Sequence, residues 1–100
     1  MDDGAAEFDR ELGRVVDRLR TMPLTKLAAS AELAFRACER LLSMAIAAGD
    51  RVPIHLPRIG AHAAGDQLAV IGHDFASLEP GVVAYAQATE ILVGLRRALP

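Results

Sequence analysis

The sequence predicts an all-α protein, a four-helix up-down bundle with a long Pro/Gly-containing strap between the second and third helices. Three observations lead to this prediction. Apolar residues recur with the helical period in four segments of the chain. The apolar content is mainly Ala, Leu, Val and Ile, with 4% aromatic residues and no Trp, a composition more typical of packed helices than of a β-sandwich. Pro and Gly separate the four segments.

The first predicted helix covers residues 4–22. Its apolar stripe has the spacing i, i+4, i+7, i+8 and i+11 and consists of Phe8, Leu12, Val15, Val16 and Leu19. Glu11–Arg14 and Asp17–Arg20 are i, i+3 pairs, which we expect on the solvent side of this helix.

The second predicted helix covers residues 24–48, between Pro23 and Gly49. Pro suits the first turn of a helix, and Gly commonly follows the last turn. At 1.5 Å per residue this helix would be roughly 37 Å long, so it needs packing partners along its whole length. Its apolar stripe consists of Leu24, Leu27, Ala31, Ala34, Phe35, Cys38, Leu41, Leu42, Ala45 and Ile46.

An irregular strap is expected over residues 50–65, where Pro53, Pro57, Gly60 and Gly65 disfavour both helix and central strand. A helix follows to residue 78. In the alternative interpretation, residues 67–72 form a short strand paired with residues 52–56. The last helix is expected over residues 82–99. Short connections favour antiparallel neighbours, which gives the up-down bundle.

Length and charge narrow the classes of function. One hundred residues indicate a single helical domain, 1–100. The formal net charge of −2 argues against a generic polyanion-binding protein, so we expect no nucleic-acid partner. The single Cys excludes an internal disulfide and a four-Cys zinc site.

The expected location is the cytoplasm. No segment approaches 18 uninterrupted apolar residues, so we expect no membrane span. The start, Met1-Asp2-Asp3, is acidic, whereas a secretory signal begins with basic residues. Ten of the eleven basic side chains are Arg, which together with the abundant Ala indicates the coding bias of a high-GC, bacterial genome.

The polar residues offer one candidate ligand site, formed by His55, His62, Asp66 and His73. His62 and Asp66 stand at i, i+4 and would share a helix face, whereas the adjacent His73 and Asp74 would point about 100° apart. No metal-binding or catalytic motif connects them. The simpler interpretation is that these residues are solvated, and we expect no metal, cofactor or catalytic residue.

We also expect structural roles for Cys38 and for two rows of arginine residues. Cys38 lies on the apolar stripe without a nearby base, so we expect a buried, unreactive thiol. The ridges Arg10–Arg14–Arg18 and Arg36–Arg40 could bind phosphates or an acidic partner. Acidic residues flank both ridges, which favours a solvated, salt-bridged face.

A homodimer interface is predicted around the last helix and the Ala face of the second. The last helix is apolar over more than one stripe, and so short a chain should leave part of it uncovered. Gly94 costs about 1 kcal/mol relative to Ala inside a helix, and close approach of another backbone would explain it. The interface residues we expect are Ala28, Ala31, Ala84, Tyr85, Ala88, Leu92 and Leu95.

The function predicted from these observations is non-enzymatic. We expect a helical interaction or regulatory module that acts through a homodimeric or partner-binding surface. The alternative is a small-ligand or metal-binding protein, or a minor enzyme, with its site at the strap of residues 50–65. The two alternatives differ in one observable feature, because a ligand site would gather His55, His62 and His73 into one cavity.

Overall fold

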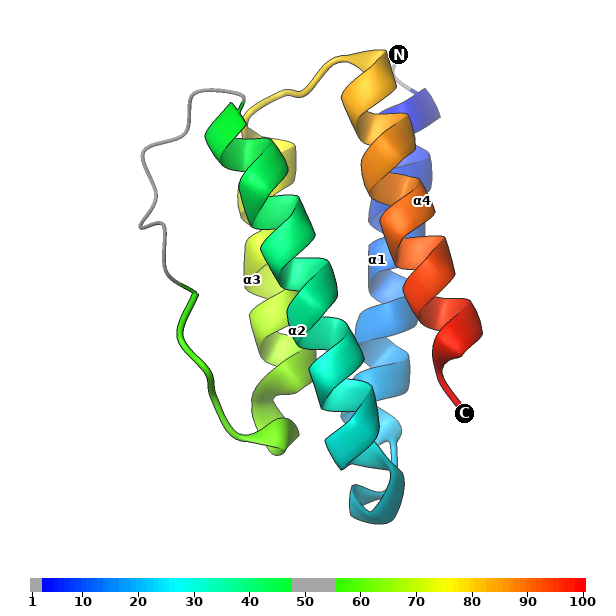
Figure 1. Ribbon diagram of the computed structural model, residues 1–100. Helices are drawn as coiled ribbons and strands as arrows, with labels where there is room; N and C mark the ends of the chain where they lie inside the picture. Colours follow the sequence, from blue (N-terminus) through cyan, green and yellow to red (C-terminus); the bar gives the residue numbers. More distant parts are fainter. Residues whose placement is uncertain (1–2, 48–55) are drawn as a thin grey trace.

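The computed structural model describes residues 3–47 and 56–100, and it is a bundle of four α-helices (Figure 1). The helices are α1 (Asp3–Thr21), α2 (Leu24–Ala47), α3 (Ala64–Ser77) and α4 (Val82–Ala98), and the short 3-10 helix η1 (Ala61–Ala63) leads into α3. The described ranges contain no strand, which confirms the all-α prediction. Residues 67–72 are helical, so the strand alternative is wrong.

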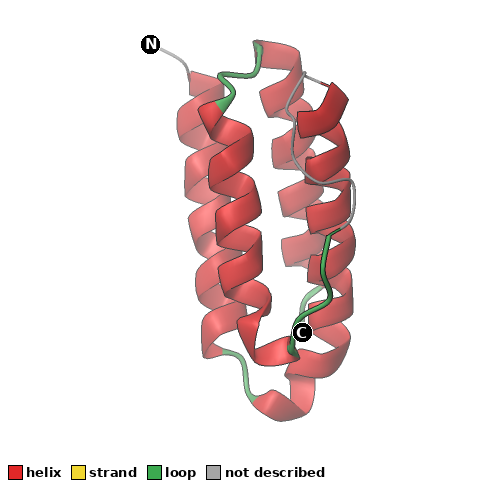
Figure 2. Ribbon diagram, turned by 90° about the vertical axis from the view of Figure 1, so that its left-hand side faces the viewer, coloured by secondary structure: helices red, strands yellow, loops and turns green. Residues whose placement is uncertain are grey.

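The helices joined by short turns are antiparallel but lie diagonally across the bundle. α1 and α4 run in one direction and α2 and α3 in the other, with the two short turns at opposite ends (Figures 1 and 2). Each of α1 and α2 packs mainly against both α3 and α4, and α1 and α2 barely touch each other. The connection between the parallel helices α2 and α3 therefore has to return along the bundle, a topology with one long crossover.

The core lies along the common axis of the helices and is built mostly by the expected stripes, but Leu24 and Ile46 of the α2 stripe are 75% and 37% exposed. The α1 stripe is buried as predicted, and Leu41, Leu68 and Leu92 contribute fully buried side chains from the other helices. At one end, Phe8, Phe75 and Tyr85 form an aromatic cluster with ring centroids 5.4 to 6.0 Å apart. This cluster joins α1, α3 and α4 through tilted and edge-to-face contacts.

Two buried glycines let α3 approach α1 closely. A Cβ atom added at Gly72 would lie 2.6 Å from Cδ2 of Leu12, and one at Gly65 would lie 3.3 Å from the carbonyl oxygen of Val16. The expectation that residues 61–65 belong to an irregular strap is wrong, because η1 and the start of α3 occupy them. Gly65 serves as a packing position inside the helix. Residues 50–55 of the expected strap lie outside the described part.

None of the described helices is both long and apolar enough to cross a lipid bilayer.

Candidate binding surfaces along helix α2

The described residues of the predicted ligand site are not brought together. His62 in η1 and His73 in the middle of α3 are both exposed. Asp66 forms an ion pair with Arg20 of α1, with 2.8 Å between Oδ1 and Nη2. His55 lies outside the described residues. Within residues 3–47 and 56–100, no three His, Cys, Asp or Glu side chains are placed to hold a metal ion.

The predicted interface residues on α4 lie in the core of the single chain. Tyr85, Ala88, Leu92 and Leu95 are at most 6% exposed, because α1 and α2 both pack against α4. The expectation that so short a chain leaves part of its last helix uncovered holds on another side of α4, where Val82 and Val83 are 75% and 70% exposed. Ala84 is half-buried. Of these four buried residues, only Leu95 lines one of the surface hollows described below.

Cys38 has the environment predicted for an inert thiol. Its side chain is 1% exposed. Burial raises the pKa of the Cys38 thiol to about 12, and the charge of Glu39 adds to this effect. Nucleophilic catalysis by a thiolate requires the opposite shift of the pKa.

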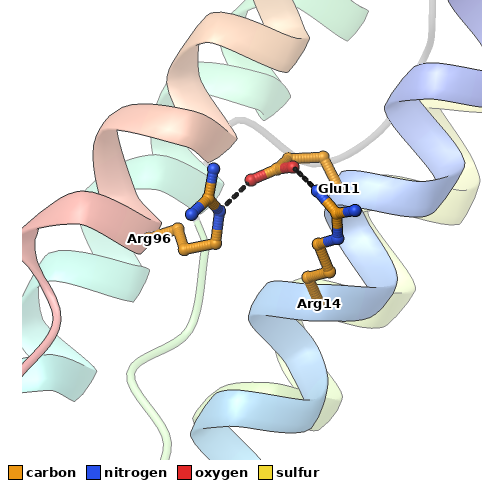
Figure 3. A network of polar contacts seen from close by, with 3 residues as sticks. All are labelled: Glu11, Arg14 and Arg96. Carbon is orange, nitrogen blue, oxygen red and sulfur yellow. Dashed lines mark hydrogen bonds and ion pairs between the residues drawn. The ribbon is translucent and has the colours of Figure 1, made fainter.

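Glu11 is buried between α1 and α4, although we expected it on the solvent side. Its side chain is 6% exposed and forms an ion pair with Nε of Arg96 (Figure 3). The expected partner within α1, Arg14, lies 3.3 Å from the other carboxylate oxygen. Two guanidinium groups thus compensate one buried carboxylate, as burial of a charge requires.

The spacing of α1 already contained a signal for this burial. Glu11 stands three residues after Phe8 and four before Val15, so it lies within the apolar stripe. Its charge led us to place it in solvent. A counter-ion from α4, Arg96, makes the buried position possible, and no local pattern identifies that partner.

In the described part of the chain, α2 contributes to at least four surface hollows, which involve two different sides of this helix. On one side, α2 and α4 form a hollow of about 220 Å³, which we call the α2/α4 groove. A neighbouring hollow of about 540 Å³ shares Arg40, Glu90 and Ile91 with it. The groove is lined by Leu33, Arg36, Ala37, Arg40, Glu90, Ile91, Gly94, Leu95 and Ala98.

The two walls of the α2/α4 groove carry opposite charges. The α2 wall contributes Arg36 and Arg40, and the α4 wall contributes Glu90. Arg36 lies 3.9 Å from Glu32 within α2. In the described part of the chain, neither Arg40 nor Glu90 takes part in an ion pair. The mixed, partly paired charges agree better with a solvated face than with an anion site.

Gly94 opens onto this groove. A Cβ atom added there would meet no other atom within 4 Å. Close approach of another segment within residues 3–47 and 56–100 therefore does not explain this glycine.

On another side of α2, Arg58 ties the end of the strap to the helix. Its Nη1 lies 2.8 Å from Oε1 of Glu32, and its guanidinium carbon lies 4.1 Å from the ring centroid of Phe35. The hydrogen bond from Arg58 lowers the pKa of Glu32, and the same bond raises the pKa of Arg58. Nearby, Gln67 Nε2 donates a hydrogen bond to the carbonyl oxygen of Pro57 at 2.9 Å.

Arg58 stands between two hollows. One, of about 210 Å³, lies toward the start of α2, where it is lined by the predicted interface residues Ala28 and Ala31. The other, of about 280 Å³, lies toward Leu42 and Ile46. Both are lined by Phe35 and Arg58. Neither of the described histidines of the predicted ligand site, His62 and His73, lines any of these four hollows.

Comparison with known proteins gives no relative. The chain matches no protein-family model, no curated protein and no solved structure.

Proposed function

We propose that this protein is a non-enzymatic helical interaction module that forms a homodimer through the α2/α4 groove. The observation that carries the proposal is Gly94. It lies inside α4, is exposed, and has open space where a side chain would be. A glycine there weakens the helix by about 0.5–1 kcal/mol relative to Ala. Room for a helix from a second chain accounts for that loss.

The lining of the groove also suits a helix. Ala37 and Ala98 are small, and Ile91 and Leu95 supply an apolar floor. Small side chains at a helix contact allow an interaxial distance of about 8 Å. This surface replaces the α4 face that we expected from the sequence, because that face is buried in the single chain.

The charges of the groove favour a second copy as the partner. A two-fold axis parallel to the helices places α2 of one copy opposite α4 of the other. Arg40 and Glu90 line the same hollow, so each would then face its counterpart across the interface. Because a two-fold axis repeats each contact, the dimer would contain two such pairs of opposite charge, each formed by Arg40 of one copy and Glu90 of the other.

Charge reversal tests this arrangement. Arg40→Glu and Glu90→Arg should each weaken the dimer at least ten-fold, about 1.4 kcal/mol, because like charges then meet. The double variant R40E/E90R restores opposite charges and should dimerise like the wild type. Sedimentation equilibrium measures the dissociation constants. Arg10→Ala, at an exposed position on α1, serves as a control outside the groove. A monomeric wild-type chain at tens of micromolar, or a double variant as weak as the single ones, would contradict the proposal.

A further inference from the structure

The position of Arg58 leads to an inference independent of dimer formation. Glu32 and Phe35 are three residues apart on α2, so their side chains share one face of the helix. Together they hold the guanidinium group of Arg58 between a carboxylate at 2.8 Å and an aromatic ring at 4.1 Å. A carboxylate combined with a ring face is a complete recognition set for a planar organic cation.

We propose that Glu32 and Phe35 form a binding site for a small organic cation, and that Arg58 occupies this site as an intramolecular competitor. The ligand is a guanidinium or amidinium compound with a short apolar tail. Its cationic group takes the place of the Arg58 guanidinium, and its tail enters one of the two adjoining hollows.

Displacement of Arg58 requires little free energy. The side chain of Arg58 is 65% exposed and that of Glu32 is 41% exposed, and ion pairs in such surroundings contribute little to stability. A displaced guanidinium reaches water directly. The hydrogen bond from Gln67 to Pro57 would remain, so the described end of the strap keeps an anchor on α3.

The neighbouring hollows determine the size and character of the ligand. They measure about 210 and 280 Å³, slightly below the usual range for drug-sized ligands, so they suit a tail of a few carbon atoms. Ala31 and Ala64 line the first, and Leu42 and Leu56 line the second.

The charge of the site favours a cation. Glu39 lines the second hollow, and its charge acts on Arg58 in the same direction as that of Glu32. Two carboxylates therefore face one guanidinium on this side of α2. A neutral or anionic ligand that displaces Arg58 would add no positive charge beside Glu39 and would leave Glu32 with Arg36 alone, 3.9 Å away.

Titration with n-butylguanidinium, followed by amide chemical shifts, tests the proposal. Arg58→Ala removes the competitor, so this variant should bind n-butylguanidinium with a dissociation constant about three- to five-fold lower than that of the wild type. The difference is small because the Arg58–Glu32 pair is exposed. The shifts should centre on Ala31 and Ala61 if the tail occupies the first hollow, and on Leu42 and Leu56 if it occupies the second. The neutral isostere n-butylurea should bind at least ten-fold more weakly.

Second-site variants distinguish recognition by Glu32 and Phe35 from nonspecific binding. In the Arg58→Ala background, Glu32→Gln should weaken butylguanidinium binding about ten-fold, and Phe35→Leu about three-fold. Arg10→Ala is the matched control for loss of an exposed arginine, and it should bind like the wild type. Equal binding by wild type and R58A, equal binding of butylurea and butylguanidinium, or no loss on E32Q would each overturn the proposal.

Discussion

Removal of Arg96 should destabilise the protein much more than removal of Glu11, although the two form one ion pair. The reason is the unequal exposure of the partners. The Glu11 side chain is 6% exposed, whereas that of Arg96 is 37% exposed. Arg96→Met leaves a buried carboxylate with a single ion partner, Arg14, whose Nη1 lies 3.3 Å away. Glu11→Met leaves an arginine that can turn to water.

The expected losses follow from these environments. Breaking a buried ion pair lowers the free energy of unfolding by about 3–5 kcal/mol when one buried charge loses its partner. Because Arg14 still contacts Glu11, we expect a loss of about 3 kcal/mol for Arg96→Met. Glu11→Met replaces a buried charge by an apolar side chain of similar length, so a loss of about 1 kcal/mol or less is expected. The double variant E11M/R96M should have about the same free energy of unfolding as E11M, because neither protein contains the buried carboxylate.

Urea unfolding monitored by circular dichroism measures these differences. All variants are compared at one protein concentration, because dimer formation makes stability depend on concentration. A change in the midpoint at constant m reports a change in stability. Equal losses for the two single variants, or a larger loss for E11M, would refute the assignment of Glu11 as a buried charge that depends on Arg96.

Three further predictions concern the core and Cys38. Leu42→Ala should lower the free energy of unfolding, measured in urea, by about 2–5 kcal/mol, because Leu42 is only 8% exposed. Val82 is 75% exposed, so Val82→Ala should change this free energy by no more than about 0.5 kcal/mol. Gly72→Ala should cost about 1–3 kcal/mol through overpacking, since the added Cβ would lie 2.6 Å from Leu12 Cδ2, and an unchanged midpoint would contradict this close contact. Cys38 should react with a thiol reagent far more slowly than free cysteine. Because its pKa rises from 9.0 to about 12 on folding, its contribution to stability is present below pH 9 and is lost as the pH rises toward 12.

The helical periodicity predicted α1, α2 and α4 because each of these stripes had a single interpretation, whereas residues 67–72 also allowed a strand. The boundaries of α1, α2 and α4 agree with the prediction to within one residue among the described positions. Residues 61–65 deviate because Gly60 and Gly65 were both taken as breaks. Gly60 lies just before η1, whereas Gly65 is a packing position against Val16, and a sequence does not show which role a glycine has.

The candidate sites were less predictable because they depend on contacts between distant segments. The Arg58–Glu32 pair spans 26 residues, and the Arg96–Glu11 pair spans 85. Neither contact has a local signature. The apolar circumference of α4 correctly indicated that part of this helix stays uncovered, but most of the residues chosen for the interface lie on the side that packs against α1 and α2. The helix-interior glycine Gly94 was informative only together with the structure, because Gly13 is equally open and only Gly94 of the two lines the α2/α4 groove.

The mass of the Gly94→Leu variant in sedimentation equilibrium tests the central claim most directly. Leu strengthens the helix and fills the open space in the α2/α4 groove, so the variant should gain about 0.5–1 kcal/mol of monomer stability and lose the dimer. Gly13→Leu is the matched control, because Gly13 in α1 is also exposed and without contacts within 4 Å. We predict dimers for the wild type and G13L at micromolar concentration and a stable monomer for G94L. Dimeric G94L, or equal monomeric masses for all three proteins, would contradict the account.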